Sequence, residues 1–210
     1  MKTYAISLKH QTDRQNELIK YFKDVEFVDA INKDDIKRTK KLKRGEIACF
    51  QSHMKVWKII SNNDNEDWVL VLEDDAKPKK DWYSKLQEGI KEIDSTYGIV
   101  YLGCGRKTTY PNMLKRMENG KQKKIDINFI FHEEKSLGKL TELCNPTTQA
   151  HAYLIKPSTC KYLLESIKTL DLPIDLQWYL YGINFARFKK GIIIQNGMFD
   201  SLIQHREPIL

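Results

Sequence analysis

Three consecutive carboxylates, Glu73, Asp74 and Asp75, follow an apolar run of strand-forming residues at positions 68–72. Such a run is typical of a buried strand, and ligands of open α/β sheets bind just beyond the carboxyl ends of the strands. Hard divalent cations prefer oxygen ligands and often share them with substrate phosphates. We therefore predict that Glu73 and Asp75 bind a divalent metal, Mn²⁺ before Mg²⁺, at a diphosphate site. The alternative is a solvated acidic turn that caps the following helix.

The elements that would position these acids alternate between strand and helix along the chain. Strands are expected at 4–8, 25–29, 68–72, 98–102, 152–155 and 191–195, and helices at 12–23, 45–60, 78–93, 157–167 and 173–181. The segment 106–148 is polar and basic, which predicts a long irregular insertion. This alternation favours an α/β fold with a mostly parallel central sheet, built as a single domain over residues 1–210.

The charge balance favours anionic partners. The 210 residues carry a net charge of +7, and basic side chains gather in segments 33–44 and 115–124. Nucleotides, phosphorylated glycolipids and anionic membranes fit this charge. Nucleic acid is not expected, because aromatic residues are not interleaved with the basic runs. No apolar segment approaches the length of a membrane span.

The four cysteines are widely spaced. They form no Cys-x-x-Cys pair, and no histidine stands at a zinc-binding spacing from them. This pattern predicts structural thiols in a reducing compartment. We therefore expect a cytoplasmic protein, and leave open a peripheral contact with the inner face of the membrane.

Several short blocks occur in a characteristic order. They are Ile6–Leu8 with Thr12–Arg14, Gly45–Cys49 with Ser52-His53, Leu72–Asp75, and His151–Ile155 with Pro173–Asp175. Together they resemble glycosyltransferase family 25, the lipopolysaccharide-biosynthesis and β-galactosyltransferase type, which also includes collagen galactosyltransferases. The chain departs from the family at Ser7, where asparagine is usual, and at Gln149-Ala150, where Gly-Thr is usual.

The resemblance implies a GT-A-like (Rossmann-like) glycosyltransferase domain, a nucleotide-sugar donor such as UDP-galactose, a divalent metal and inversion at the anomeric carbon. It places donor-binding residues at Leu8, Arg14, Glu46, His53 and Asp74. Arg14 is equally compatible with a helix-surface charge. Glu46 and His53 lie two helical turns apart on one face, where a core hydrogen-bonded pair is the alternative.

Other roles come from residues late in the chain. His205 is a candidate third metal ligand, although an exposed histidine is the simpler interpretation. An inverting transfer needs a base for the acceptor hydroxyl, and Asp175 is our candidate; its alternative is an acid favoured by the helix dipole. His151 and Tyr153 are candidate acceptor-binding residues, and a satisfied core position is the alternative for His151.

We therefore expect a metal-dependent inverting glycosyltransferase. It would move galactose from a UDP-sugar to a hydroxyl of a glycan acceptor such as lipopolysaccharide or lipooligosaccharide, and both free and lipid-linked acceptors fit this expectation. One alternative is a metal-dependent nucleotidyltransferase or phosphohydrolase, but no glycine-rich phosphate loop follows Gly103-Cys104-Gly105. Another is a basic module that binds nucleic acid or a membrane surface.

Overall fold

The computed structural model describes residues 1–37, 39, 42–103, 135–144 and 150–199. Its strands are β1 Thr3–Ser7, β2 Glu26–Asp29, β3 Val69–Glu73, β4 Ala76–Pro78, β5 Tyr97–Tyr101, β6 Thr141–Cys144, β7 Ala152–Ile155, β8 Asn184–Phe188 and β9 Ile193–Gln195. Its α-helices are α1 Thr12–Ile19, α2 Arg44–Ile60, α3 Trp82–Ile90, α5 Pro157–Ser166 and α6 Ile174–Gln177, and its 3₁₀ helices are η1 Lys33–Asp35 and η2 Trp178–Tyr181. No helix in this part of the chain has the length and hydropathy needed to cross a membrane.

The central sheet has seven strands in the order β2-β1-β3-β7-β5-β8-β6. The pairs β1–β2, β1–β3 and β5–β8 are parallel, whereas β7 and β6 run antiparallel to their neighbours. β2, β1, β3, β5 and β8 therefore share one direction, which confirms the predicted α/β class with a mostly parallel sheet. β4 and β9 form a separate two-stranded antiparallel sheet.

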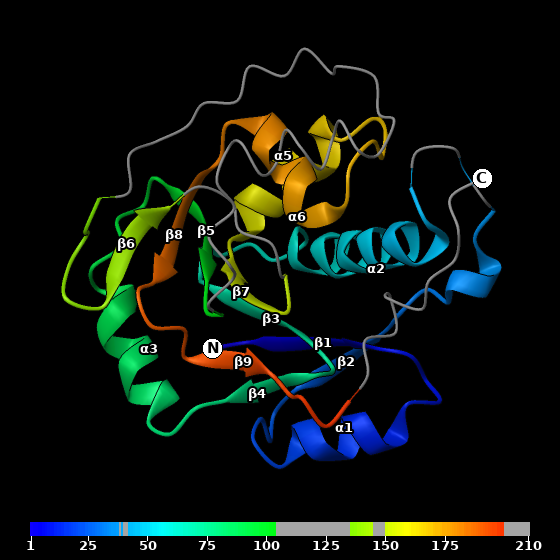
Figure 1. Ribbon diagram of the computed structural model, residues 1–210. Helices are drawn as coiled ribbons and strands as arrows, with labels where there is room; N and C mark the ends of the chain where they lie inside the picture. Colours follow the sequence, from blue (N-terminus) through cyan, green and yellow to red (C-terminus); the bar gives the residue numbers. More distant parts are fainter. Residues whose placement is uncertain (38, 40–41, 104–134, 145–149, 200–210) are drawn as a thin grey trace.

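Helices cover both faces of the central sheet. Figure 1 shows α2, α5 and α6 on one face and α1 and α3 on the other. The side chains of β3 alternate between these layers: Val71 packs in the cluster that contains Trp57, and Leu70 and Leu72 pack in the cluster that contains Leu86. Because both faces of β3 are buried, its sequence is continuously apolar until the acids begin.

The predicted helix over 78–93 is wrong at its start. Pro78 ends β4 and is paired with Ile193 of β9. Proline is tolerated at the edge of a small sheet, where no ladder hydrogen bond is required of its nitrogen. The helix begins only at Trp82, after Asp81 turns the chain with φ 59°. The residues that follow the acids are therefore held by antiparallel pairing with β9, a strand far away in the sequence.

Two strands at one end of the sheet were not predicted. β8 pairs with β5, and β6, which lies within the segment 106–148, pairs with β8 at the edge. Arg187 of β8 donates to Glu142 of β6 at 2.7 Å and holds this edge in place. Residues 106–134 and 145–148 of the expected insertion lie outside the described residues.

Candidate active site

The three acids follow β3, next to the point in the sheet where the order of successive strands reverses. β1 is flanked by β2 on one side and by β3 on the other, both parallel to it, so its carboxyl end is a switch point at which α/β proteins bind ligands. A cavity of about 280 Å³ opens there, between the strand ends, α1, α2 and η1. Its lining includes Ser7, Leu8, Arg14, Cys49, His53, Glu73, Asp74 and Asp75.

Glu73 is the last residue of β3 and is partly buried. Its Oε1 lies 3.3 Å from Nε2 of His53 and accepts from the thiol of Cys49 at 3.9 Å. Burial disfavours ionisation, but the hydrogen bond from His53 favours it, and the pKa of Glu73 lies below its usual value. Glu73 is therefore a carboxylate at neutral pH.

Asp74 forms a buried ion pair with Arg14. Its Oδ1 accepts from Nη1 of Arg14 at 2.9 Å, and its Oδ2 accepts from Oγ of Ser7 at 2.8 Å. The ring of Phe199 lies 5.0 Å from the Arg14 guanidinium carbon. Burial raises the pKa of Asp74, and the bonds from Arg14 and Ser7 act against that rise. Both oxygens of Asp74 are thus already engaged by the protein, which ties the end of β3 to α1 and β1.

Asp75 has the least satisfied carboxyl of the three. Its Oδ1 is buried and has no hydrogen-bond partner among the described residues, while Oδ2 lies 3.4 Å from the amide of Gln195. Burial, followed by the charges of Glu73 and Asp74, raises its pKa to about 7. A buried polar atom without a partner is uncommon in folded proteins. A divalent cation would satisfy this oxygen and offset the repulsion among the acids, so the residues present fit the metal predicted from sequence.

Cys49, His53 and Glu73 form a second arrangement in the same cavity. One ligand atom from each lies within 4.8 Å of the others. Sequence reasoning treated Cys49 as a structural thiol and missed this group, although Cys49 and His53 are one helical turn apart on α2. Burial, with the charges of Glu73 and Asp175, raises the pKa of Cys49 well above its usual value. The thiol thus stays protonated at neutral pH and donates to Glu73.

Asp175 lies on the same side of the sheet as this group. It stands in the first turn of α6, and its charge raises the pKa of Cys49 on α2 together with the charges of Glu73 and Asp75. Asp175 therefore acts on the same thiol as Glu73 and Asp75, although it lies about 100 positions later in the sequence. This is the observation that associates Asp175 with the cavity.

His151 and Tyr153, the candidate acceptor-binding residues, are both buried. Tyr153 is 0% exposed, and its hydroxyl lies 2.8 Å from Nδ1 of His53. His151 is 2% exposed, and its Nε2 lies 3.3 Å from the carbonyl oxygen of Ile193. Its ring packs against Gly103, where a larger side chain would collide with it. Burial lowers the pKa of His151, so the ring is neutral.

Sequence comparison identifies the family. Residues 1–178 match the family model described as "Glycosyltransferase family 25 (LPS biosynthesis protein)". The chain belongs to glycosyltransferase family 25. The resemblance inferred from the ordered blocks is thereby confirmed.

Relatives of this family 25 chain match different shares of its length. Procollagen galactosyltransferase 2 of Mus musculus is 28% identical over 147 residues, which are 55% of this chain and 23% of that protein. The same protein of Homo sapiens is 30% identical over 129 residues, 49% of this chain and 20% of that protein. A "Putative glycosyltransferase" of Haemophilus influenzae is 27% identical over 213 residues, 91% of this chain and 66% of that protein. The chain thus spans only part of the length of these relatives.

Three further predicted residues of the family 25 chain lie in different places. Leu8 lines the cavity, and its carbonyl oxygen accepts from Nε2 of Gln15 at 3.1 Å. Glu46 accepts from the backbone N–H of Lys43 at 2.8 Å and so caps α2, and it is not among the residues that line the cavity. His205 lies outside the described residues.

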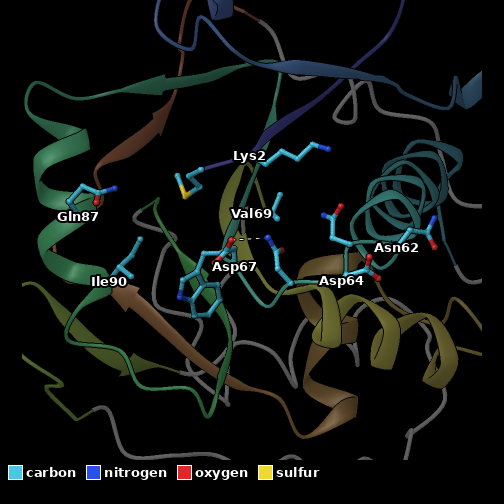
Figure 2. Close-up of a pocket in the computed structure, with 11 residues that line it drawn as sticks. Lys2, Asn62, Asp64, Asp67, Val69, Gln87 and Ile90 are labelled. Atoms are coloured by element: carbon cyan, nitrogen blue, oxygen red, sulfur yellow. Dashed lines mark hydrogen bonds between the residues drawn. The ribbon is translucent and has the colours of Figure 1, made fainter.

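A larger cavity, of about 770 Å³, lies at the opposite ends of β1 and β3. Figure 2 shows its lining, which includes Lys2 and Val69 at the strand starts and the polar loop with Asn62, Asp64 and Asp67. These three loop side chains are exposed to solvent. The amino ends of parallel strands are not where α/β folds of this kind bind ligands, so the smaller cavity is the candidate site of the family 25 chain.

Proposed function

We propose that this chain transfers a sugar, galactose in the first instance, from a UDP-sugar to a hydroxyl of a glycan acceptor, with a divalent cation and with inversion. Membership of family 25 supports glycosyl transfer, and the names of the procollagen relatives support galactose. The single observation that carries the proposal is the buried Oδ1 of Asp75, which has no hydrogen-bond partner within the described part of the chain and stands beside the ionised Glu73 at the switch point of the sheet.

Glu73 and Asp75 would hold the cation, Mn²⁺ or Mg²⁺, and His205 is proposed as a third ligand. When bound, such a cation stabilises the negative charge that develops on a departing diphosphate. Asp74 is not available for this task, because Arg14 and Ser7 occupy both of its oxygens. We therefore assign Asp74 and Arg14 to positioning the strand end beside the donor, rather than to contacting the cation.

The remaining residues divide between donor and acceptor. Leu8 and His53 line the cavity and are proposed to border the donor. Glu46 would act on the donor site only by fixing the start of α2. Tyr153 would act through His53, since its hydroxyl is buried against that ring. His151 is the other proposed acceptor-side residue, adjoining Glu73 through the backbone bond from Glu73 N to its carbonyl oxygen, 2.9 Å long.

The acceptor is proposed to be a lipid-linked or surface glycan such as lipopolysaccharide. The family description and the net charge of +7, which suits a phosphorylated glycolipid or an anionic membrane face, support this part of the proposal. A cytoplasmic location with peripheral membrane contact belongs to the same proposal, and no nucleic-acid partner is included.

A panel of nucleotide sugars tests the donor and the metal together. With Mn²⁺ present, UDP-galactose should raise the thermal midpoint more than UDP-glucose or UDP-N-acetylglucosamine, and the rise should vanish with EDTA. Product analysis should show release of UDP. Release of pyrophosphate would instead indicate a nucleotidyltransferase, and no stabilisation by any donor would contradict the proposal.

Asp175→Asn tests the proposed base. The carboxylate would take the proton from the acceptor hydroxyl while the bond from the anomeric carbon to the diphosphate breaks and the new glycosidic bond forms. We expect kcat to fall by about 10²- to 10⁴-fold while the Kd for UDP-galactose stays unchanged. The rate of UDP release, measured with lipooligosaccharide and collagen-peptide acceptors, and calorimetric donor binding give the two values.

Glu165→Gln is the matched control, because Glu165 is an exposed acid on the neighbouring helix α5. It should leave both values unchanged. An Asp175→Asn variant with the kcat of the unmodified protein would remove Asp175 from the mechanism.

A further inference from the structure

Three buried side chains form a hydrogen-bonded chain that ends on Glu73. Nε1 of Trp57 donates to the hydroxyl of Tyr153 at 2.9 Å. That hydroxyl lies 2.8 Å from Nδ1 of His53, and Nε2 of His53 lies 3.3 Å from Oε1 of Glu73. Trp57, Tyr153 and His53 are each 0% exposed, so solvent does not compete for these bonds. The chain links α2, β7 and the end of β3.

The chemistry of the donors sets the direction of every bond. An indole N–H can only donate, so the oxygen of Tyr153 accepts from Trp57. The hydroxyl proton of Tyr153 must then be donated elsewhere, because a buried donor without a partner is costly. Nδ1 of His53 is the acceptor within reach among the described residues. Nδ1 is therefore unprotonated, and in the neutral ring the proton sits on Nε2 and is donated to Glu73.

We propose that the Trp57–Tyr153–His53 chain fixes the Nε2–H tautomer of His53 and thereby holds Oε1 of Glu73, leaving Oε2 for the cation. This inference rests on the proposed function, because it assumes that Glu73 is a metal ligand. His53 and Tyr153 are then positioning residues. His53 does not ligate the cation, because a bond to Nε2 would displace the proton that Glu73 receives.

An anchored carboxylate gives a measurable advantage in metal binding. Hydrogen-bond partners of a metal ligand orient it before the metal arrives, and their loss typically lowers metal affinity by about 10- to 100-fold. In this protein the anchor comes from the buried core, whereas Oδ1 of Asp75 has no partner among the residues that the structure describes. The two proposed ligands therefore differ: Glu73 is held in advance, and Asp75 becomes satisfied when the cation binds.

The tautomer is directly measurable in the unmodified protein. Two-dimensional ¹⁵N–¹H spectra of histidine-labelled protein distinguish protonated from unprotonated ring nitrogens, and His53→Gln identifies the signals of His53. We expect Nε2 to carry the proton and Nδ1 to be a hydrogen-bond acceptor. A proton on Nδ1 alone would overturn the inference, whether or not any variant folds.

Tyr153→Phe tests the consequence for the metal. Without the hydroxyl, Nδ1 has no donor, so the spectra should show loss of the fixed Nε2–H tautomer. The Kd for Mn²⁺, followed by the electron paramagnetic resonance signal of free Mn²⁺, should rise by about 10- to 100-fold. Tyr97→Phe is the matched control, because Tyr97 is also a buried tyrosine of the sheet but stands on β5.

The outcomes distinguish a failure of the proposed metal site from a failure of the proposed positioning role. If the unmodified protein binds no Mn²⁺, the proposed function fails, while the spectra still decide the tautomer. If the unmodified protein binds Mn²⁺ and Tyr153→Phe binds it equally well, with the tautomer unchanged, the positioning role is wrong and the metal site stands.

Discussion

Asp75→Asn is expected to lower cation-dependent turnover by at least about 10³-fold while the protein remains folded. The amide retains the size of the side chain but loses the charge that would hold the cation. Binding of Mn²⁺ should be lost in parallel, and UDP release from UDP-galactose should no longer respond to added metal. Asp67→Asn, in the exposed loop before β3, is the control and should behave as the unmodified protein. Full activity of Asp75→Asn would contradict the assignment.

The same substitution should stabilise the metal-free protein at alkaline pH. Folding raises the pKa of Asp75 from 3.8 to about 7. A carboxyl whose pKa is raised binds its proton more tightly in the folded state, so its contribution to stability is greatest below pH 4 and is lost as pH rises through 7. Asp75→Asn removes this loss, which is on the order of 2–4 kcal/mol at pH 8. Urea unfolding with EDTA should therefore show a stability gain for the variant at pH 8 and little difference at pH 4.

Arg14→Met is expected to lower the free energy of unfolding by about 3–5 kcal/mol. The arginine side chain is 7% exposed and the aspartate side chain is 9% exposed, so removal of the cation leaves the charge of Asp74 buried without its partner. The length of the aliphatic part is retained, which confines the change mainly to the charge. Urea unfolding at pH 7 measures the effect.

A double variant separates charge from packing. Arg14→Met with Asp74→Asn should recover much of the lost stability, because the buried carboxylate is then absent. Lys20→Met is the control on the same side of the sheet, since the Lys20 side chain is 66% exposed and its pair with Glu17 should contribute nothing measurable. Equal stability of Arg14→Met and the unmodified protein would mean that the Arg14–Asp74 pair does not hold the strand end in place.

The sequence was sufficient to place the acids but not to distinguish them. The apolar run before Glu73 predicted a buried strand, and the alternation of elements predicted that its end would lie at a ligand-binding edge. Which of three adjacent carboxylates is engaged by the protein depends on Arg14, whose partner Asp74 is 60 positions away. The sequence around the acids contains no information about this ion pair.

Partners distant in sequence also explain the other differences. Cys49 was predicted to be a structural thiol and His53 a donor-binding residue, and only the packing of α2 against the end of β3 brings both to Glu73. Tyr153 was predicted to bind the acceptor. The sequence of β7 alone does not show that the Tyr153 hydroxyl is hydrogen-bonded to His53, 100 positions away. Pro78 was predicted to start a helix, because the residues around it give no sign of its pairing with the later strand β9.

Crystals grown with UDP and Mn²⁺, measured at a wavelength where manganese scatters anomalously, show whether Glu73 and Asp75 hold the cation. We expect a single strong anomalous peak between the carboxylates of Glu73 and Asp75, with the diphosphate of UDP bound to it. A peak at another position, or bound UDP with no manganese near Asp75, would contradict it.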